Sequence, residues 1–216
     1  MSRRIVLFRH GQTDWNAENR AQGWTDIPLN SIGLAQARHA APLLSSYDAS
    51  VLVSSDLERA RQTAEIVGAA LGLTPEFDPR WREFDVGERS GLSMAEFQTR
   101  YPTEYAAWMA DDESIRVIGA ESSSDVRARM EAAFAELTSR LSSDQTAIVV
   151  THGAALKVAV CALIGWPTPV RGDLVGIGNC HWVELIEAEP GVFRLGGYNL
   201  PGDLGTPDFS SAEGVG

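Results

Sequence analysis

The stretch LFRHGQTDWN, at residues 7–16, ends a short apolar run with an arginine, a histidine and a glycine. A second stretch, IVVTHGAALK at residues 148–157, repeats this arrangement with a threonine before its histidine and glycine. Short apolar runs bounded by turn residues are typical of buried β-strands. Two of the four histidines of the chain, His10 and His152, therefore directly follow predicted strands.

Strands and helices are expected to alternate along most of the chain. Apolar runs predict strands at residues 5–8, 51–53, 147–150 and 182–186, with a weaker one near Phe193. Apolar residues that recur every three or four positions predict helices at residues 31–44, 57–71, 126–141 and 154–164. This alternation predicts an α/β sandwich with a largely parallel sheet.

Helix boundaries and one long connection carry further signals. Ser55 and Glu58 are expected to form a capping box for the 57–71 helix, which should end at Gly72. Pro42 should end or kink the 31–44 helix early, because proline has no amide hydrogen and clashes with the preceding turn. Residues 77–121 lack strand alternation, and we expect short helices there over one end of the sheet.

The composition excludes several classes of protein. A formal net charge of −11 argues against a nucleic-acid or anionic-membrane surface. The N-terminal apolar run is too short for a signal peptide, and no run approaches the ~18 residues of a membrane span. We therefore expect a cytoplasmic protein. Two cysteines, Cys161 and Cys180, do not suggest a disulfide framework, and the sequence shows no metal-binding cluster of Cys or His. The sequence leaves the oligomeric state open.

The two predicted strand ends bring several residues to one edge of the sheet. In open α/β sheets, ligands bind outside the carboxyl ends of the strands. The helix after His152 would direct free N–H groups to this edge, and two arginines would add fixed positive charge. We expect a pocket for phosphate or a similar oxyanion, with close backbone approach at the glycines, built from Arg9, His10, Gly11, Arg59, His152 and Gly153. Taken alone, these residues are equally compatible with ordinary surface positions.

Seven ordered segments, spread over residues 4 to about 182, strengthen the interpretation. They are LFRHGQTDWN (7–16), QGWTDIPLNSIGLAQA (22–37), SSDLERARQTA (54–64), RWREFDVGERSG (80–91), GAESSSDV (119–126), VVTHG (149–153) and GNCHW (178–182). Together they resemble the motifs of the histidine phosphatase superfamily, the phosphoglycerate-mutase-like group. The resemblance implies a three-layer α/β/α fold in one catalytic domain, residues 1–200, that needs neither a metal nor a cofactor. Residues 201–216, rich in Gly, Pro and Ser, are expected to form a poorly ordered tail.

The resemblance also implies roles for individual residues. By position, His10 is the nucleophile, transiently phosphorylated on a ring nitrogen, and Glu83 is the proton donor and acceptor. The implied phosphate and substrate ligands are Arg9, Arg59, His152 and Gly153, with Asn16, Gln22 and Gly23 lining the pocket. Arg89 and Ser90 stand where many relatives have an aromatic residue and a glutamate. That segment normally contributes to the substrate rim, so substrate specificity is the property that the resemblance predicts least.

Three functions remain to be compared. The leading hypothesis is a metal-independent phosphomonoesterase that hydrolyses a small phosphorylated metabolite through a phosphohistidine. The alternative is a phosphoglycerate mutase, which usually needs more basic residues in its lid. Residues 83–114 contain two arginines, no lysine and many acidic residues, which favours hydrolysis. A catalytically inactive phospho-ligand binding module is disfavoured because His10, His152, Arg9, Arg59 and Glu83 are all present.

Overall fold

A six-stranded sheet of order β3-β2-β4-β1-β5-β6 forms the centre of the computed structural model, which describes residues 2–202. β1 (Arg4–Arg9), β2 (Ala49–Ser54), β3 (Glu76–Phe77) and β4 (Thr146–Thr151) run parallel. β5 (Trp182–Glu189) and β6 (Val192–Leu200) form an antiparallel hairpin that pairs with β1. The predicted α/β fold with a largely parallel sheet is confirmed. Most of the predicted tail, residues 203–216, lies outside the described residues.

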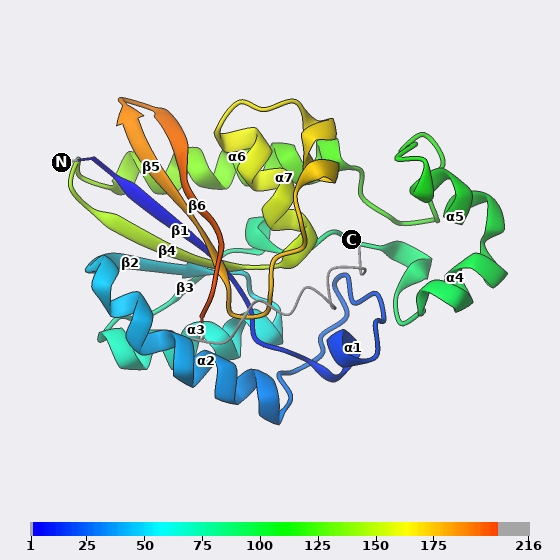
Figure 1. The fold of residues 1–216 in the computed structure, drawn as a ribbon, viewed down its shortest axis with the longest axis horizontal. Helices are drawn as coiled ribbons and strands as arrows, with labels where there is room; N and C mark the ends of the chain where they lie inside the picture. The colour runs from blue at the N-terminus through cyan, green and yellow to red at the C-terminus, as the bar shows by residue number, and fades with distance from the viewer. Residues whose placement is uncertain (1, 203–216) are drawn as a thin grey trace.

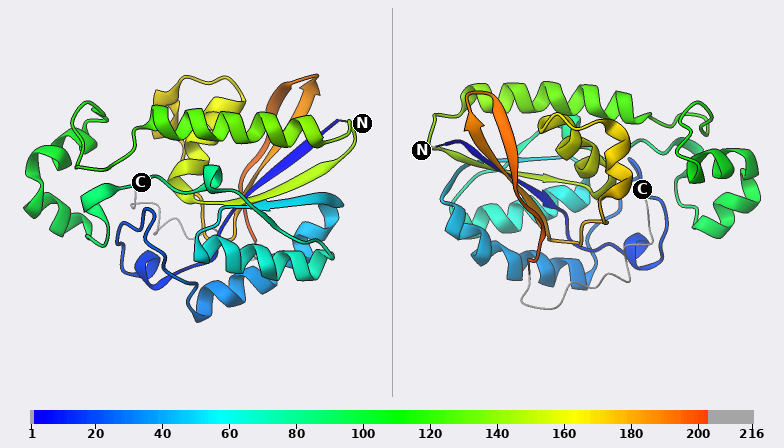
Figure 2. Two further views of the ribbon diagram at one scale, coloured as in Figure 1. Left: turned by 180° about the vertical axis from the view of Figure 1, so that it is seen from behind. Right: turned by 45° about the horizontal axis from the view of Figure 1, so that its top comes forward.

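Helices cover both faces of the sheet (Figures 1 and 2). α2 (Ser31–Leu44) and α3 (Glu58–Leu71) pack on one face, and α6 (Ser123–Arg140) and α7 (Gly153–Leu163) on the other. Because successive strand residues point to opposite faces, Val6 and Phe8 join the first helical layer while Ile5 and Leu7 join the second. The near-continuous apolar runs of β1 and β4 are explained by this burial on both faces.

Short helices complete the chain. They are α1 (Asp14–Ala17), α4 (Met94–Arg100), α5 (Pro102–Met109) and the 3₁₀ turns η1 (Ser45–Tyr47), η2 (Pro79–Trp81), η3 (Gly87–Arg89) and η4 (Thr168–Asp173). α4 and α5 project from the carboxyl end of the parallel strands, as Figure 1 shows at its right. No helix among residues 2–202 is long and apolar enough to cross a membrane.

Three details of the sequence prediction were wrong. α2 continues through Pro42 to Leu44, because a proline two residues before the helix end removes one hydrogen bond of the last turn only. The Ser55–Glu58 capping box is absent: Leu57 is the N-cap and uses no side-chain hydrogen bond. The connection at residues 77–121 does contain the expected short helices, but the short strand β3 at its start was missed, because two residues are too few to give a periodic signal.

The packing of α2 against the loop that follows β1, next to His10, depends on a contact between two glycines. A Cβ on Gly11 would lie 2.5 Å from the Gly33 carbonyl oxygen of α2, and a Cβ on Gly33 would lie 2.1 Å from the Gln12 carbonyl oxygen. Both distances are far below van der Waals contact with backbone atoms that cannot rotate away. Gly11 was expected to make room for a ligand, but it makes room for α2 instead.

We therefore predict that Gly33→Ala lowers the free energy of unfolding by about 1–3 kcal/mol or more, since the backbone after His10 must shift. Gly172→Ala is the matched control, because a Cβ there meets nothing within 4 Å. Urea unfolding of both variants measures the difference. A Gly33→Ala protein as stable as the control would show that the backbone can shift here at little cost in free energy.

Candidate active site

The two strand-end histidines lie side by side at the carboxyl edge of the sheet. Arg9 of β1 pairs with Thr151 of β4, so the residues that follow, His10 and His152, are neighbours. Their ring centroids are 5.1 Å apart and both side chains are buried. The backbone N–H of His10 also donates to the Thr151 carbonyl, at 3.0 Å. Adjacent parallel strands thus bring together two imidazoles separated by most of the sequence.

The hydrogen bond of His10 determines which ring nitrogen is available. Nδ1 lies 2.7 Å from the Gly11 carbonyl oxygen, and a carbonyl can only accept. Nδ1 therefore carries the proton, and the Nε2 lone pair is left for chemistry. Burial, followed by the charges of Arg59 and Arg9, holds the pKa of His10 well below its ordinary value. The imidazole is consequently neutral at neutral pH, the state in which it is a nucleophile.

The second imidazole is fixed in the opposite tautomer. Arg59 Nε donates to His152 Nδ1 at 3.2 Å, so His152 Nε2 carries the proton and donates to Ser55 Oγ at 2.8 Å. Burial and the Arg59 charge also hold the pKa of His152 well below its ordinary value. His152 is therefore a neutral hydrogen-bonding group and does not add a cation to the pocket. The predicted capping box is absent because the Glu58 N–H donates to Asp26 Oδ1 at 2.6 Å and not to Ser55.

Arg59 is a buried cation held by backbone carbonyls. Its side chain is 1% exposed, and its two Nη atoms donate to the carbonyls of Thr25 (2.9 Å) and Gly23 (2.7 Å). Burial lowers its pKa to about 10, which leaves it positively charged at neutral pH. Gly23, at φ +50, gives the loop the left-handed turn that presents these carbonyls. Among residues 2–202, the guanidinium is thus preorganised by carbonyls and an imidazole, with no carboxylate within ion-pair distance.

Arg9 has one buried N–H group without a partner. Its Nη1 donates to the Ile177 carbonyl, while its Nε has no hydrogen-bond partner among residues 2–202. A Cβ on Gly153 would lie 3.2 Å from this Nε, so the missing side chain keeps the guanidinium approachable. Burial lowers the pKa of Arg9, and the charge of Glu83 opposes that effect. Unsatisfied buried donors are rare, and one on a cation favours an anionic ligand.

Glu83 occupies the N-terminus of α7. Its Oε1 accepts from the N–H groups of Ala155 (2.8 Å) and Phe84 (2.9 Å), and its Oε2 from Ala154 (3.1 Å). The helix N–H groups that the sequence predicted to be free for phosphate are therefore taken by a carboxylate of the protein. Burial lowers the pKa of Arg9 and of Arg59, and the negative charge of Glu83 opposes that lowering in both.

The remaining predicted residues line the same edge. Asn16 Oδ1 accepts from the Thr13 N–H at 3.1 Å and lies 3.4 Å from Asn179 Nδ2. Gln22 is 8% exposed, and its Oε1 has no partner among the described residues. Asn179, which donates to the His10 carbonyl at 3.0 Å, was not predicted as a site residue. Its place in the GNCHW segment, one of the seven motifs, was the available signal.

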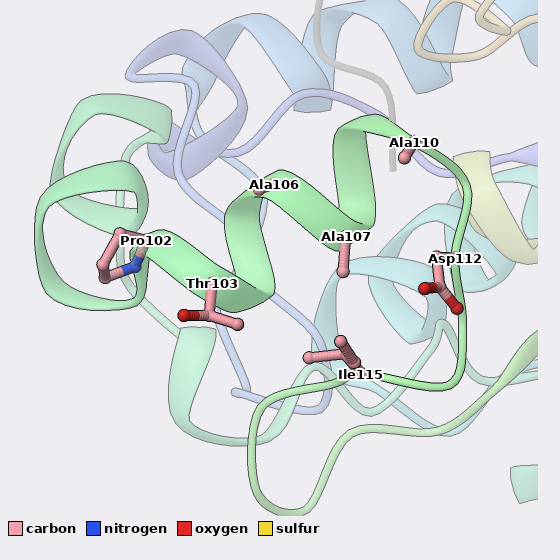
Figure 3. Close-up of a pocket in the computed structure, with 7 residues that line it drawn as sticks. All are labelled: Pro102, Thr103, Ala106, Ala107, Ala110, Asp112 and Ile115. Carbon is pink, nitrogen blue, oxygen red and sulfur yellow. The ribbon is translucent and has the colours of Figure 1, made fainter.

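Other candidate features lie elsewhere. His39 is exposed on α2, and His181 hydrogen-bonds through Nδ1 to Asn199 Oδ1 at 3.0 Å, so neither joins the pair of site histidines. A hollow along α5, drawn in Figure 3, has no basic residue in its lining: Pro102, Thr103, Ala106, Ala107, Ala110, Asp112 and Ile115. Within residues 2–202, no group of three or more His, Cys, Asp or Glu residues could hold a metal ion. Positive charge for an oxyanion is gathered at the sheet edge instead.

The family model described as histidine phosphatase superfamily (branch 1) matches residues 5–201. The chain belongs to this superfamily. It is 35% identical over 202 residues to a glucosyl-3-phosphoglycerate phosphatase of Mycolicibacterium vanbaalenii, with 88% of this chain and 89% of the relative covered. It is also 33% identical over 211 residues to a probable phosphoglycerate mutase GpmB of Enterobacter sp. (strain 638), with 97% of each covered.

Solved structures agree with this placement. A mycobacterial glucosyl-3-phosphoglycerate phosphatase in complex with VO3 superposes with a TM-score of 0.83 at 35% identity, covering 92% of this chain and 100% of that chain. The predicted superfamily and fold class are confirmed, and so is the enzyme class: this histidine phosphatase is a phosphoric monoester hydrolase.

The two buried imidazoles predict how the stability of this histidine phosphatase depends on pH. Their folded pKa values are lowered, so the unfolded chain binds more protons once the pH falls below about 6.5. The free energy of unfolding should therefore fall with pH below this value, by at most about 1.4 kcal/mol per pH unit for each histidine.

Urea unfolding between pH 7.5 and 5 measures this slope. His152→Asn should reduce the slope by the contribution of one proton, at most about 1.4 kcal/mol per pH unit. Gln36→Ala, which removes an uncharged contact with the Gln12 N–H, should lower stability equally at every pH. A wild-type slope retained by His152→Asn would contradict a neutral, buried His152.

Proposed function

We propose that this enzyme hydrolyses a small phosphorylated metabolite through a phosphohistidine on His10. The observation that carries the proposal is the Nδ1–H of His10 fixed on the Gly11 carbonyl, which leaves the Nε2 lone pair unprotonated among buried cations. In the first step Nε2 attacks phosphorus and the ester P–O bond breaks. In the second step the oxygen of a water attacks phosphorus, the P–N bond breaks, and phosphate and neutral His10 are released.

Arg9 and Arg59 are proposed to bind the equatorial oxygens of the transferring group. His152 is proposed to join them by exchanging its Nε2–H bond from Ser55 Oγ to a phosphate oxygen. Phosphoryl transfer is accelerated mainly by positioning and by fixed charge near these oxygens. Arg9 Nε is one of four arginine Nε donors that are buried without a partner among residues 2–202, and it lies beside Gly153. Arg59 is held rigid by two carbonyls. Asn16, Gln22, Gly23 and Gly153 would complete the rim of this pocket.

Glu83 is proposed to move the proton. It would donate to the leaving alkoxide in the first step and take a proton from the attacking water in the second, which balances the cycle. Its carboxylate lies at the α7 N-terminus, close enough to both arginines for its charge to act on them.

For the substrate, the relatives named glucosyl-3-phosphoglycerate phosphatase make that compound the first to test. The named mutase relatives make phosphoglycerate interconversion the second candidate. One observation favours hydrolysis: of the two arginines of residues 83–114, Arg89 is packed against Phe97 (4.7 Å) and Trp108 (4.6 Å), which leaves exposed Arg100 as the available cation. A phosphatase screen of phosphometabolites with chelator present, beside a coupled mutase assay, decides between them.

The nucleophile is tested by trapping. Brief reaction with labelled substrate and rapid quenching should leave acid-labile, base-stable label on the peptide that contains His10, as expected of a phosphoramidate. His10→Ala should lose both label and turnover, while His181→Asn, which removes a histidine outside the pair, should keep both. Label retained by His10→Ala would move the nucleophile elsewhere.

The proton carrier is tested by leaving groups. Glu83→Gln should lower kcat for alkyl phosphates on the order of 10²–10⁴-fold, because the alkoxide then leaves without a proton. Aryl phosphates with acidic phenols need less protonation and should lose much less. Glu88→Gln, an acidic position in the same segment that accepts from the Tyr101 hydroxyl, is the control. Equal losses on both substrate classes would assign Glu83 to binding or structure.

A further inference from the structure

The segment that carries Glu83 is held from behind by one arginine of α6. Arg129 donates through Nη1 to the carbonyls of Arg80 (2.8 Å) and Arg82 (2.7 Å), and through Nη2 to that of Glu83 (2.8 Å). Three carbonyls within four residues thus converge on a single guanidinium. Such convergence fixes the path of the backbone immediately before and at the proposed proton carrier.

Glu121 completes the set of acceptors around this guanidinium. Its Oε1 accepts from Arg129 Nε and its Oε2 from Arg129 Nη2, both at 2.9 Å. Oε2 also accepts from the Asp85 N–H at 2.8 Å, and the Glu121 N–H donates to the Asp85 carbonyl at 2.9 Å. The five N–H groups of the guanidinium therefore have five acceptors, and the pair is only 15% and 17% exposed.

A third contact reaches the same peptide from the surface. Trp24 Nε1 donates to the Glu83 carbonyl at 2.8 Å, while its indole, 39% exposed, lies 4.9 Å from the Arg82 guanidinium. The carbonyl of Glu83 is therefore bonded from two directions, and its carboxylate is bonded to α7. Both ends of this one residue are fixed by different elements of the fold.

We propose that Arg129 is a positioning residue for Glu83, held in place by Glu121. This inference rests on the proposed role of Glu83 as proton carrier. Arg129 bonds to the backbone and to Glu121, and it acts on the reaction through Glu83. A small displacement of a catalytic group lowers the rate by a large factor, so a rigidly held segment helps to keep the rate high. Lysine cannot replace arginine here, because its ammonium group has three donors and no planar fork.

The proposal makes a specific kinetic expectation. Arg129→Lys should lower kcat for alkyl phosphates on the order of 10- to 100-fold, with KM little changed, because the carboxyl group is displaced while the phosphate pocket is kept. Aryl phosphates should lose much less, as for Glu83→Gln. In the double variant Arg129→Lys/Glu83→Gln, the alkyl phosphate rate should be no lower than in Glu83→Gln alone, since the first residue acts through the second.

The experiment measures kcat and KM for one alkyl and one aryl phosphate in these three variants. Arg140→Met is the control, because it removes an exposed ion pair with Glu76 from the same helix. Glu121→Gln and Trp24→Phe are milder variants that keep the test decisive if Arg129→Lys does not fold, and both should shift the alkyl-to-aryl ratio in the same direction.

Each outcome decides one point. If Glu83→Gln is leaving-group dependent and Arg129→Lys reproduces this pattern non-additively, the positioning role is supported. If Glu83→Gln shows the dependence and the Arg129 and Glu121 variants lose only stability, or lose activity equally on both substrates, the positioning role is overturned and that of Glu83 stands. If Glu83→Gln shows no dependence, the proposed role of Glu83 is overturned and the inference with it.

Discussion

The burial of arginine at the carboxyl edge of the parallel strands is the constraint on which the rest of this site depends. Arg59 is 1% exposed and bonds to two carbonyls and one imidazole, and Arg9 keeps a buried N–H without a partner among the described residues. Removing such cations from water is costly unless opposite charge is supplied. Burial, assisted by the charges of these arginines, holds the pKa of both imidazoles well below the ordinary value and keeps them neutral. An acidic protein thus holds a local positive site whose remaining donor suits an oxyanion.

Much of this arrangement could be predicted from the sequence, because it follows from local patterns. Apolar runs predicted the strands, and strand ends in a parallel sheet share an edge, so His10 and His152 were expected at the same edge. That β1 and β4 are adjacent, which makes the two histidines neighbours, was shown only by the structure. Long-range hydrogen bonds could not be predicted in this way. The Glu58 N–H was expected to bond to Ser55 but donates to Asp26, and the α7 N-terminus was expected to be free but holds Glu83. In both cases a distant residue competes for a group whose local pattern suggested another partner.

The departure from the family pattern at residues 89 and 90 also has a structural explanation. Arg89 lies on the rings of Phe97 and Trp108, which belong to α4 and α5. Ser90 instead hydrogen-bonds to Thr25, whose carbonyl holds Arg59. The two residues therefore have different roles: Arg89 packs within the projecting helices, and Ser90 supports the residue whose carbonyl holds Arg59. The sequence alone gave no means of telling them apart.

In the proton transfer proposed for Glu83, its peptide is fixed, so the side-chain torsions are the freedom that the transfer would use. Oε1 accepts two N–H bonds and Oε2 only one, the longer bond to Ala154. A protonated carboxyl oxygen must turn its hydrogen toward the leaving group, and the oxygen with fewer bonds gives up less on turning. Oε2 is therefore the oxygen suited to carry the proton, while Oε1 keeps the carboxyl group attached to α7. Arg129 and Trp24 hold the backbone carbonyl of Glu83, so the proposed transfer would move a proton without moving the backbone of this segment.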